Sequence, residues 1–198
     1  MHPPDLSSIP ALIPALLGSV VDYAGLFPPA KLDLRQAMAN YEQYQKSPEH
    51  WLLGRFVLPL ARLPEFTALL PAFPFHSGSL SGIVSSDWPT AIAQISSLIN
   101  APIAISALEF PPLAPTAIET VLSLLPAEVE AFFEIPLHSN LDDYLQVLQH
   151  PQSAAKLRTG GVTAADFPSR AQLGQVILAL AKARVPFKAT AGLHHALP

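Results

Sequence analysis

Short apolar runs alternate with amphipathic segments along the chain. The runs have the length of β-strands, and several stop at proline, which cannot continue a central strand because it lacks a backbone N–H. These runs predict seven strands, at residues 18–27, 52–59, 80–85, 103–110, 131–137, 154–159 and 186–193.

The intervals between the runs have helical spacing. Apolar residues recur every three or four positions after Asp33, which is a suitable N-cap, and Ser169 precedes an Ala- and Leu-rich segment in the same way. The spacing predicts six helices, at residues 34–44, 63–70, 88–99, 116–125, 141–148 and 169–183.

Strict alternation of strands and helices predicts an α/β fold with a parallel sheet in a single domain, 1–198. Two architectures fit, the (βα)8 TIM barrel and an open doubly wound sheet. The first predicted strand is not followed by G-x-G-x-x-G or by a Walker lysine loop, and this absence weakens the case for the open doubly wound sheet. Charged residues near the ends of successive strands favour the TIM-barrel-like fold, because those ends meet at one mouth.

The predicted count of seven strands and six helices is short of a complete barrel, which takes about 250 residues. Either the chain is truncated at its C-terminus before the last helix, strand and helix, or the first strand is misassigned. We favour truncation. An open barrel would expose strand edges, so self-association into a homo-oligomer is expected.

Composition narrows the range of partners. The chain carries 11 Lys and Arg against 15 Asp and Glu, a net charge of -4, which gives no general reason to bind nucleic acid or an anionic membrane. The most apolar N-terminal stretch, 9–21, is interrupted by Pro10 and Pro14 and is too short to span a bilayer. It also lacks signal-peptide features, so we expect a cytoplasmic protein. The absence of cysteine excludes disulfides, zinc-thiolate sites and cysteine nucleophiles.

Charge is scarce, at 13% of residues, yet several charged residues lie in or beside predicted strands. Burying a charge costs several kcal/mol unless it is paired or functional. These residues are therefore the candidates for chemistry, with structural ion pairing as the alternative. They are Asp22, Arg55, Glu109, Glu134, Lys156, Arg158 and Lys188.

The segment KLRTGG (156–161) places Lys156 and Arg158 on the same face of a strand. The pair Gly160 and Gly161 follows Thr159 and lets backbone N–H groups approach a ligand. A guanidinium beside such a turn suits a phosphate or carboxylate. The alternative is a tight turn with an ion-paired arginine.

The segment FKATAGLHH (187–195) places Lys188 and Thr190 on one face, with Gly192 and His194 after them. This strand follows that of Lys156 in the chain, so the two lysines could face each other across neighbouring strands. Two ammonium groups held close together favour the neutral form of one, which can form an imine with a carbonyl compound. The alternative is that one lysine pairs with Glu134 and the other extends to solvent.

The acidic residues have several candidate roles. Asp22 is a candidate general base or an orienting partner for a lysine, and the alternative is that it caps the first loop. Arg55 could clamp a substrate anion or pair with Asp22. Glu109 and Glu134 could accept protons or neutralise the lysines.

A metal site has little support in the sequence. His194 and His195 are adjacent and point to opposite sides of an extended segment, and no H-E-x-x-H spacing exists. The sequence therefore predicts no metal and no cofactor.

Four motifs together resemble a family of uncharacterised bacterial proteins: VDYAGLFPPA (20–29), WLLGRF (51–56), KLRTGG and FKATAGLHH. That family supplies no established activity. A looser likeness of site layout is to class I aldolase barrels of the deoxyribose-phosphate type, in which K-x-x-T-G and K-A-x-G-G segments end neighbouring strands. Arg158 and Gly161 are extra features, and Ala191 replaces a glycine. The matching positions are Lys156, Thr159, Gly160, Lys188, Ala189 and Gly192.

Three functions are compatible with these residues. The favoured one is an enzyme of the lyase type that acts on a small anionic metabolite, a carbonyl compound with a phosphate or carboxylate. Lys188 or Lys156 would form the imine, Arg158 and Arg55 would hold the anion, and Asp22, Glu109 or Glu134 would move protons. The other residues expected to contact the substrate are Thr159, Gly160, Gly161, Thr190, Gly192 and His194. The second is a metal-assisted isomerase, lyase or hydrolase that uses carboxylates and His194 or His195. The third is a non-catalytic assembly subunit or degenerate copy.

Overall fold

The computed structural model describes residues 12–73, 79–96, 104–137, 141–161, 163 and 166–192. The chain divides into two compact units, which we describe separately. Unit 1 comprises Met1–Ser81 and Pro102–Ala104, and unit 2 comprises Gly82–Ala101 and Ile105–Pro198. The single domain expected from the sequence stays a prediction.

Seven strands lie in the described part of the chain, one in each apolar run that predicted a strand. They are hydrogen-bonded in chain order, and the neighbours with a defined register, β1/β2, β4/β5, β5/β6 and β6/β7, are parallel. The predicted α/β class with a parallel sheet is confirmed. The strands are β1 (Val21–Tyr23), β2 (Leu53–Pro59), β3 (Leu80–Ile83), β4 (Ile105–Phe110), β5 (Glu130–Glu134), β6 (Ser153–Arg158) and β7 (Phe187–Thr190).

The same described residues contain seven α-helices rather than the six predicted. They are α1 (Leu12–Leu17), α2 (Leu34–Gln45), α3 (Leu63–Leu69), α4 (Trp88–Ser96), α5 (Pro115–Leu124), α6 (Leu141–Val147) and α7 (Arg170–Ala183), with 3-10 turns at His50–Leu52, Leu60–Arg62 and Leu70–Ala72. The unpredicted helix is α1. Pro14 is its third residue, in the first turn, where a backbone N–H has no partner within the helix and proline is tolerated.

The first strand is shorter than predicted from 18–27. A turn precedes β1, in which the Gly18 N–H donates to the Pro14 carbonyl (2.8 Å) and Ser19 has a φ of 56°. A second turn follows β1, in which the Phe27 N–H donates a hydrogen bond to the Ala24 carbonyl (2.9 Å). Apolar composition alone therefore overestimated the strand, because hydrogen bonds within the two turns take the backbone out of the sheet.

In unit 1, α2 packs against β2. The Asp33 carboxylate caps α2 by accepting from the Gln36 N–H (2.9 Å), as predicted. The helix buries Met38 and Tyr41, and the Tyr41 hydroxyl donates to the Gly54 carbonyl (2.8 Å). This hydrogen bond joins the helix directly to the backbone of β2.

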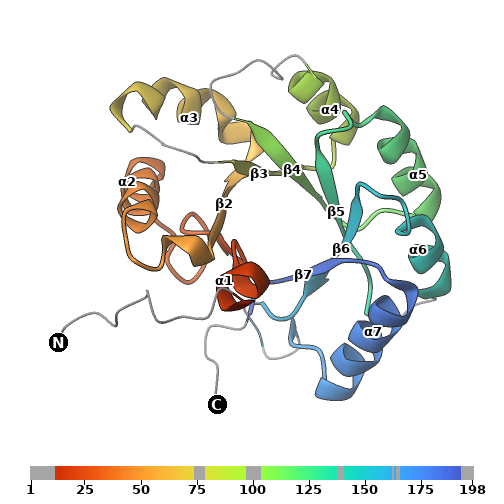
Figure 1. Ribbon diagram of the computed structural model, residues 1–198. Helices are drawn as coiled ribbons and strands as arrows, with labels where there is room; N and C mark the ends of the chain where they lie inside the picture. The colour runs from red at the N-terminus through yellow and green to blue at the C-terminus, as the bar shows by residue number, and fades with distance from the viewer. Residues whose placement is uncertain are drawn as a thin grey trace. The chain divides into compact units, whose positions relative to one another are not determined.

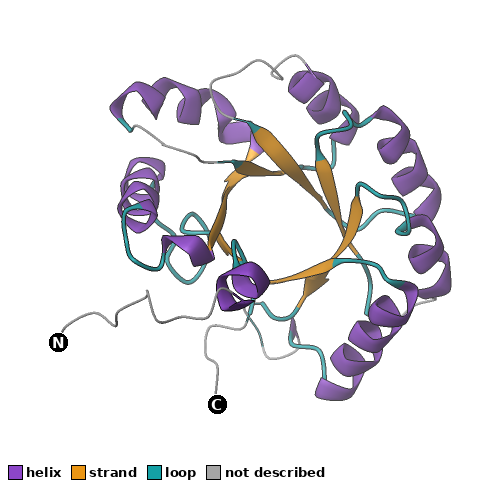
Figure 2. Ribbon diagram, in the orientation of Figure 1, coloured by secondary structure: helices purple, strands orange, loops and turns teal. Residues whose placement is uncertain are grey.

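In unit 2, helices α4 to α7 lie along one face of strands β4 to β7 (Figures 1 and 2). Because side chains alternate along a strand, each strand contributes one set of residues to each face. One set is apolar and fully buried, with Leu108, Phe133 and Leu157 as examples. The other set contains a small buried cluster of Ala107, Phe132 and Ala154 together with charged residues, among which Glu109 is opposite Phe132 in the register.

Helix α7 begins with the capping box predicted at Ser169. The Ser169 side chain accepts from the Gln172 N–H, and the Gln172 side chain accepts from the Ser169 N–H. The helix ends at Ala183 and is followed by its C-cap, Arg184, which adopts the left-handed conformation (φ 57°, ψ 34°). In the described part of the chain, no helix is long and apolar enough to cross a membrane.

Candidate functional site

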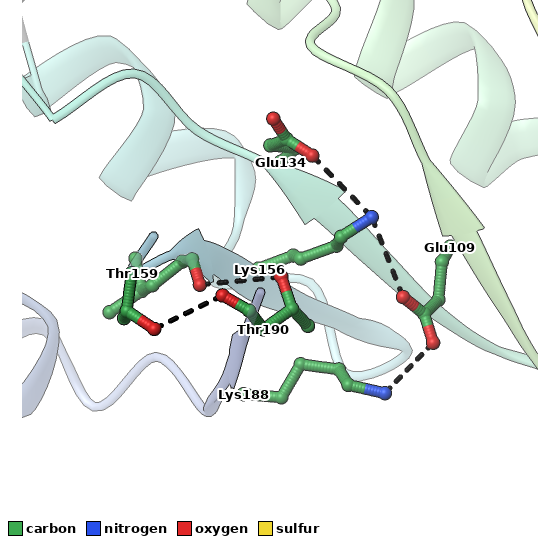
Figure 3. Close-up of polar contacts among 7 residues, drawn as sticks. Glu109, Glu134, Lys156, Thr159, Lys188 and Thr190 are labelled. Carbon is green, nitrogen blue, oxygen red and sulfur yellow. Dashed lines mark hydrogen bonds and ion pairs between the residues drawn. The ribbon is translucent and has the colours of Figure 1, made fainter. Parts of the chain in front are cut away.

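Four charged side chains from four strands of unit 2 come together on one face of the sheet (Figure 3). We call them the Lys–Glu cluster: Glu109 of β4, Glu134 of β5, Lys156 of β6 and Lys188 of β7. The register explains why they meet, since Glu134 is opposite Lys156 and Lys156 is opposite Lys188. The sequence predicted that the two lysines would be partners on neighbouring strands.

Glu109 bridges the two lysines, one carboxylate oxygen to each. Lys188 Nζ donates to Glu109 Oε1 at 2.8 Å, which is a short, charge-assisted hydrogen bond. Lys156 Nζ lies 3.5 Å from Glu109 Oε2 and 3.4 Å from Glu134 Oε2, so its ion pairs are looser. The alternative drawn from the sequence is right that one lysine, Lys156, pairs with Glu134. It is wrong that the other extends to solvent, because Lys188 pairs with Glu109.

The cluster is shielded from water to different degrees. The Glu109 side chain is 2% exposed, against 10% for Lys156, 15% for Lys188 and 16% for Glu134. Charges buried to this extent need partners, and two carboxylates balance two ammonium groups here. The ring centroid of Phe132 lies 5.0 Å from Lys188 Nζ, which adds a cation–π contact to the cluster.

Thr159 and Thr190 tie the ends of β6 and β7 together. The Thr159 hydroxyl (3.1 Å) and the Thr159 N–H (2.8 Å) both donate to the Thr190 carbonyl. The Thr190 hydroxyl donates to the Leu157 carbonyl at 3.5 Å, the limit for a hydrogen bond. These contacts hold the two lysine-bearing strands in register, a structural task in addition to the substrate contact predicted for both threonines.

The glycines after β6 and β7 allow the chain to approach itself. A Cβ on Gly160 would lie 2.5 Å from the Ala191 carbonyl oxygen, and one on Gly161 would lie 2.5 Å from Asp166 Cβ. A Cβ on Gly192 would lie 2.9 Å from the Thr159 carbonyl oxygen. The space beside each glycine is thus filled by protein, as the tight-turn alternative required. Binding of a ligand to their N–H groups stays a prediction.

The remaining candidates lie in other places. Arg158 is exposed at the end of β6, opposite Thr190 in the register. Asp22 and Arg55 belong to unit 1, where the Asp22 carboxylate accepts from the Arg55 backbone N–H (2.8 Å). The bond joins Asp22 to the backbone of Arg55, and the roles expected of the two side chains stay predictions. His194 and His195 lie outside the described residues.

Metal ligands are not grouped in the described chain: no three His, Cys, Asp or Glu side chains there are close enough to hold an ion. Sequence reasoning missed one residue of the site, Phe132. Its signal was available, because alternation along β5 places it on the same face as Glu134, two residues later.

Comparison with known proteins identified no relative. No family model, curated protein or solved structure matches the chain. The resemblances to uncharacterised bacterial proteins and to aldolase barrels therefore stay predictions.

Proposed function

We propose that the Lys–Glu cluster is the reactive centre of an enzyme of the lyase type that forms a lysine imine with a small anionic carbonyl compound. The observation that carries the proposal is the pairing of Lys156 with Lys188 across β6 and β7, with Glu109 in contact with both amino groups. Lysines shielded from water beside other charged groups are the usual setting for such chemistry.

The cluster contains the groups that an imine needs. The amine nitrogen of Lys156 or Lys188 adds to the carbonyl carbon, the carbonyl oxygen becomes a hydroxyl, and this hydroxyl leaves as water when the C=N bond forms. Glu109 touches both amines, so it can accept a proton from the attacking amine and return it to the leaving hydroxyl. Glu134, beside Lys156, offers a second acceptor.

Arg158 is our proposed partner for the anionic group of the substrate. It is exposed at the end of β6, two residues after Lys156 on the same strand face. A guanidinium binds carboxylate or phosphate through two parallel hydrogen bonds.

We also propose that the strands follow the order of a (βα)8 barrel. Parallel neighbours in chain order support this, as do the helices on one face of β4–β7. Catalytic residues of such barrels come from the ends of several strands.

Borohydride trapping tests the imine. The protein is incubated with pyruvate or glyceraldehyde 3-phosphate, reduced with borohydride and weighed by mass spectrometry. Hydride converts the C=N bond to a stable amine, so the protein should gain the mass of the carbonyl compound less one oxygen atom. We expect one of the variants Lys156→Met and Lys188→Met to abolish the gain.

The matched control is Lys182→Met, which removes an exposed lysine from the last turn of α7 and should leave trapping unchanged. An adduct that persists at full yield in the variant lacking both Lys156 and Lys188 would refute the proposal.

A further inference from the structure

The two carboxylates of the Lys–Glu cluster are held very differently. Glu109 uses one oxygen for Lys188 and the other for Lys156, and its side chain is 2% exposed. Glu134 meets Lys156 through Oε2 at 3.4 Å, and its side chain is 16% exposed at the last residue of β5. Of the two, Glu134 is the carboxylate that a molecule entering from solvent can replace.

Charge balance gives a reason for such a replacement. With two lysines and two glutamates the cluster has no net charge, so an approaching anion meets ammonium groups that are already neutralised. An anion gains the full attraction of Lys156 only when a carboxylate leaves it, because like charges beside one ammonium group repel each other.

The geometry points to Glu134 as an internal counter-ion: a carboxylate that pairs with Lys156 in the ligand-free protein and yields its place to the anionic group of the substrate. That group then pairs with Lys156 as well as with Arg158, two residues further along β6, and Lys188 is the lysine left to form the imine. This inference rests on the proposed function, since it concerns the substrate of the same site. It assigns Glu134 a role in selecting the charge of the substrate, distinct from proton transfer.

The exchange requires only a side-chain movement. The backbone beyond Glu134 stays bound to β6, because the Ile135 N–H donates to the Lys156 carbonyl (3.2 Å). The glutamate side chain can rotate about its own bonds toward solvent while the strands keep their register.

An incoming anionic group can also make a shorter hydrogen bond to Lys156 than Glu134 does. Hydrogen bonds between an ammonium group and an anionic oxygen are usually about 2.7–2.9 Å long. Glu134 Oε2 lies 3.4 Å from Lys156 Nζ, so the present pair lacks the short hydrogen bond that a free carboxylate or phosphate could form. The looseness of the contact favours exchange.

The substitution Glu134→Gln tests the inference because it removes the charge and keeps the shape. Binding of inorganic phosphate and of pyruvate is measured by isothermal titration calorimetry at low salt. We expect both dissociation constants to fall by about tenfold, as the loss of a competing unit charge beside the ligand predicts. Unchanged or weaker binding of both anions overturns the inference.

The matched control is Glu130→Gln. Glu130 lies at the other end of β5, so the change in net charge is the same while Lys156 keeps its partner. Tightening that is equally large in this control would show a general charge effect and would also overturn the inference. The double variant Glu134→Gln with Lys156→Met should lose the gain, because the gain requires the ammonium group.

A third variant keeps the test informative if Glu134→Gln does not fold. Glu134→Asp shortens the side chain by one methylene and moves the carboxylate away from Lys156, so it should tighten anion binding less than Gln but in the same direction. Binding of inorganic phosphate needs no imine, because phosphate has no carbonyl group. Borohydride trapping therefore decides the proposed function separately from the phosphate titration.

Discussion

Replacing Glu109 by glutamine should strongly destabilise unit 2. The change keeps the side-chain volume but leaves Lys156 and Lys188 with Glu134 as the remaining carboxylate of the cluster. Removing one partner of a buried ion pair costs about 3–5 kcal/mol, because the other charge stays buried without compensation. Glu109 is 2% exposed and the lysine side chains 10% and 15%, so solvent screens little. We expect a loss of about 3 kcal/mol in the free energy of unfolding.

Urea unfolding followed by circular dichroism measures this loss. A double-mutant cycle with Lys188→Met isolates the pair, and we expect the double variant to be about 1–3 kcal/mol more stable than the sum of the single variants predicts. The control is Glu65→Gln, at the exposed ion pair with Arg62 (2.9 Å), which should change stability far less. A Glu109→Gln variant as stable as the wild-type protein, or strictly additive single variants, would refute the reasoning.

Four further predictions concern stability. Burial first, then the charge of Asp22, raises the pKa of Tyr41 to about 12 from 10.0. Its contribution to folding is therefore complete below pH 10 and lost as pH rises through about 12, a loss that Tyr41→Phe should remove in unfolding measurements at alkaline pH. Gly160→Ala should lower the free energy of unfolding by about 1–3 kcal/mol, and with it the melting temperature, because its Cβ would lie 2.5 Å from the Ala191 carbonyl oxygen. Gly174→Ala, in α7 with open space around it, should instead raise stability by about 0.5–1 kcal/mol. Arg184→Gly should raise stability by about 1 kcal/mol in thermal unfolding, since Arg184 has a left-handed backbone. Arg184→Ala, which keeps the strain, should not.

The sequence predicted well what depends on local periodicity. The alternation along β6 and β7, together with their order in the chain, predicted that Lys156 and Lys188 would be partners, and the register places them so. Ser169 and Asp33 were identified as helix caps from chemistry that acts over three residues.

What depends on stagger between distant strands could not be predicted. Glu109 is two strands away from Lys156 and three from Lys188, yet it touches both. Which carboxylate reaches which lysine depends on the stagger of the strands and on side-chain torsions. The short first strand and helix α1 were missed for a related reason, since turn hydrogen bonds and the place of Pro14 in the first helical turn decided those elements.

The most direct test of the imine is to locate the reduced adduct on the chain. After borohydride reduction in the presence of pyruvate or glyceraldehyde 3-phosphate, the protein is digested and its modified peptide sequenced by mass spectrometry. The proposed function predicts a single major adduct, on Lys156 or Lys188. No adduct with either compound, or modification spread over exposed lysines such as Lys46 and Lys182, would contradict it.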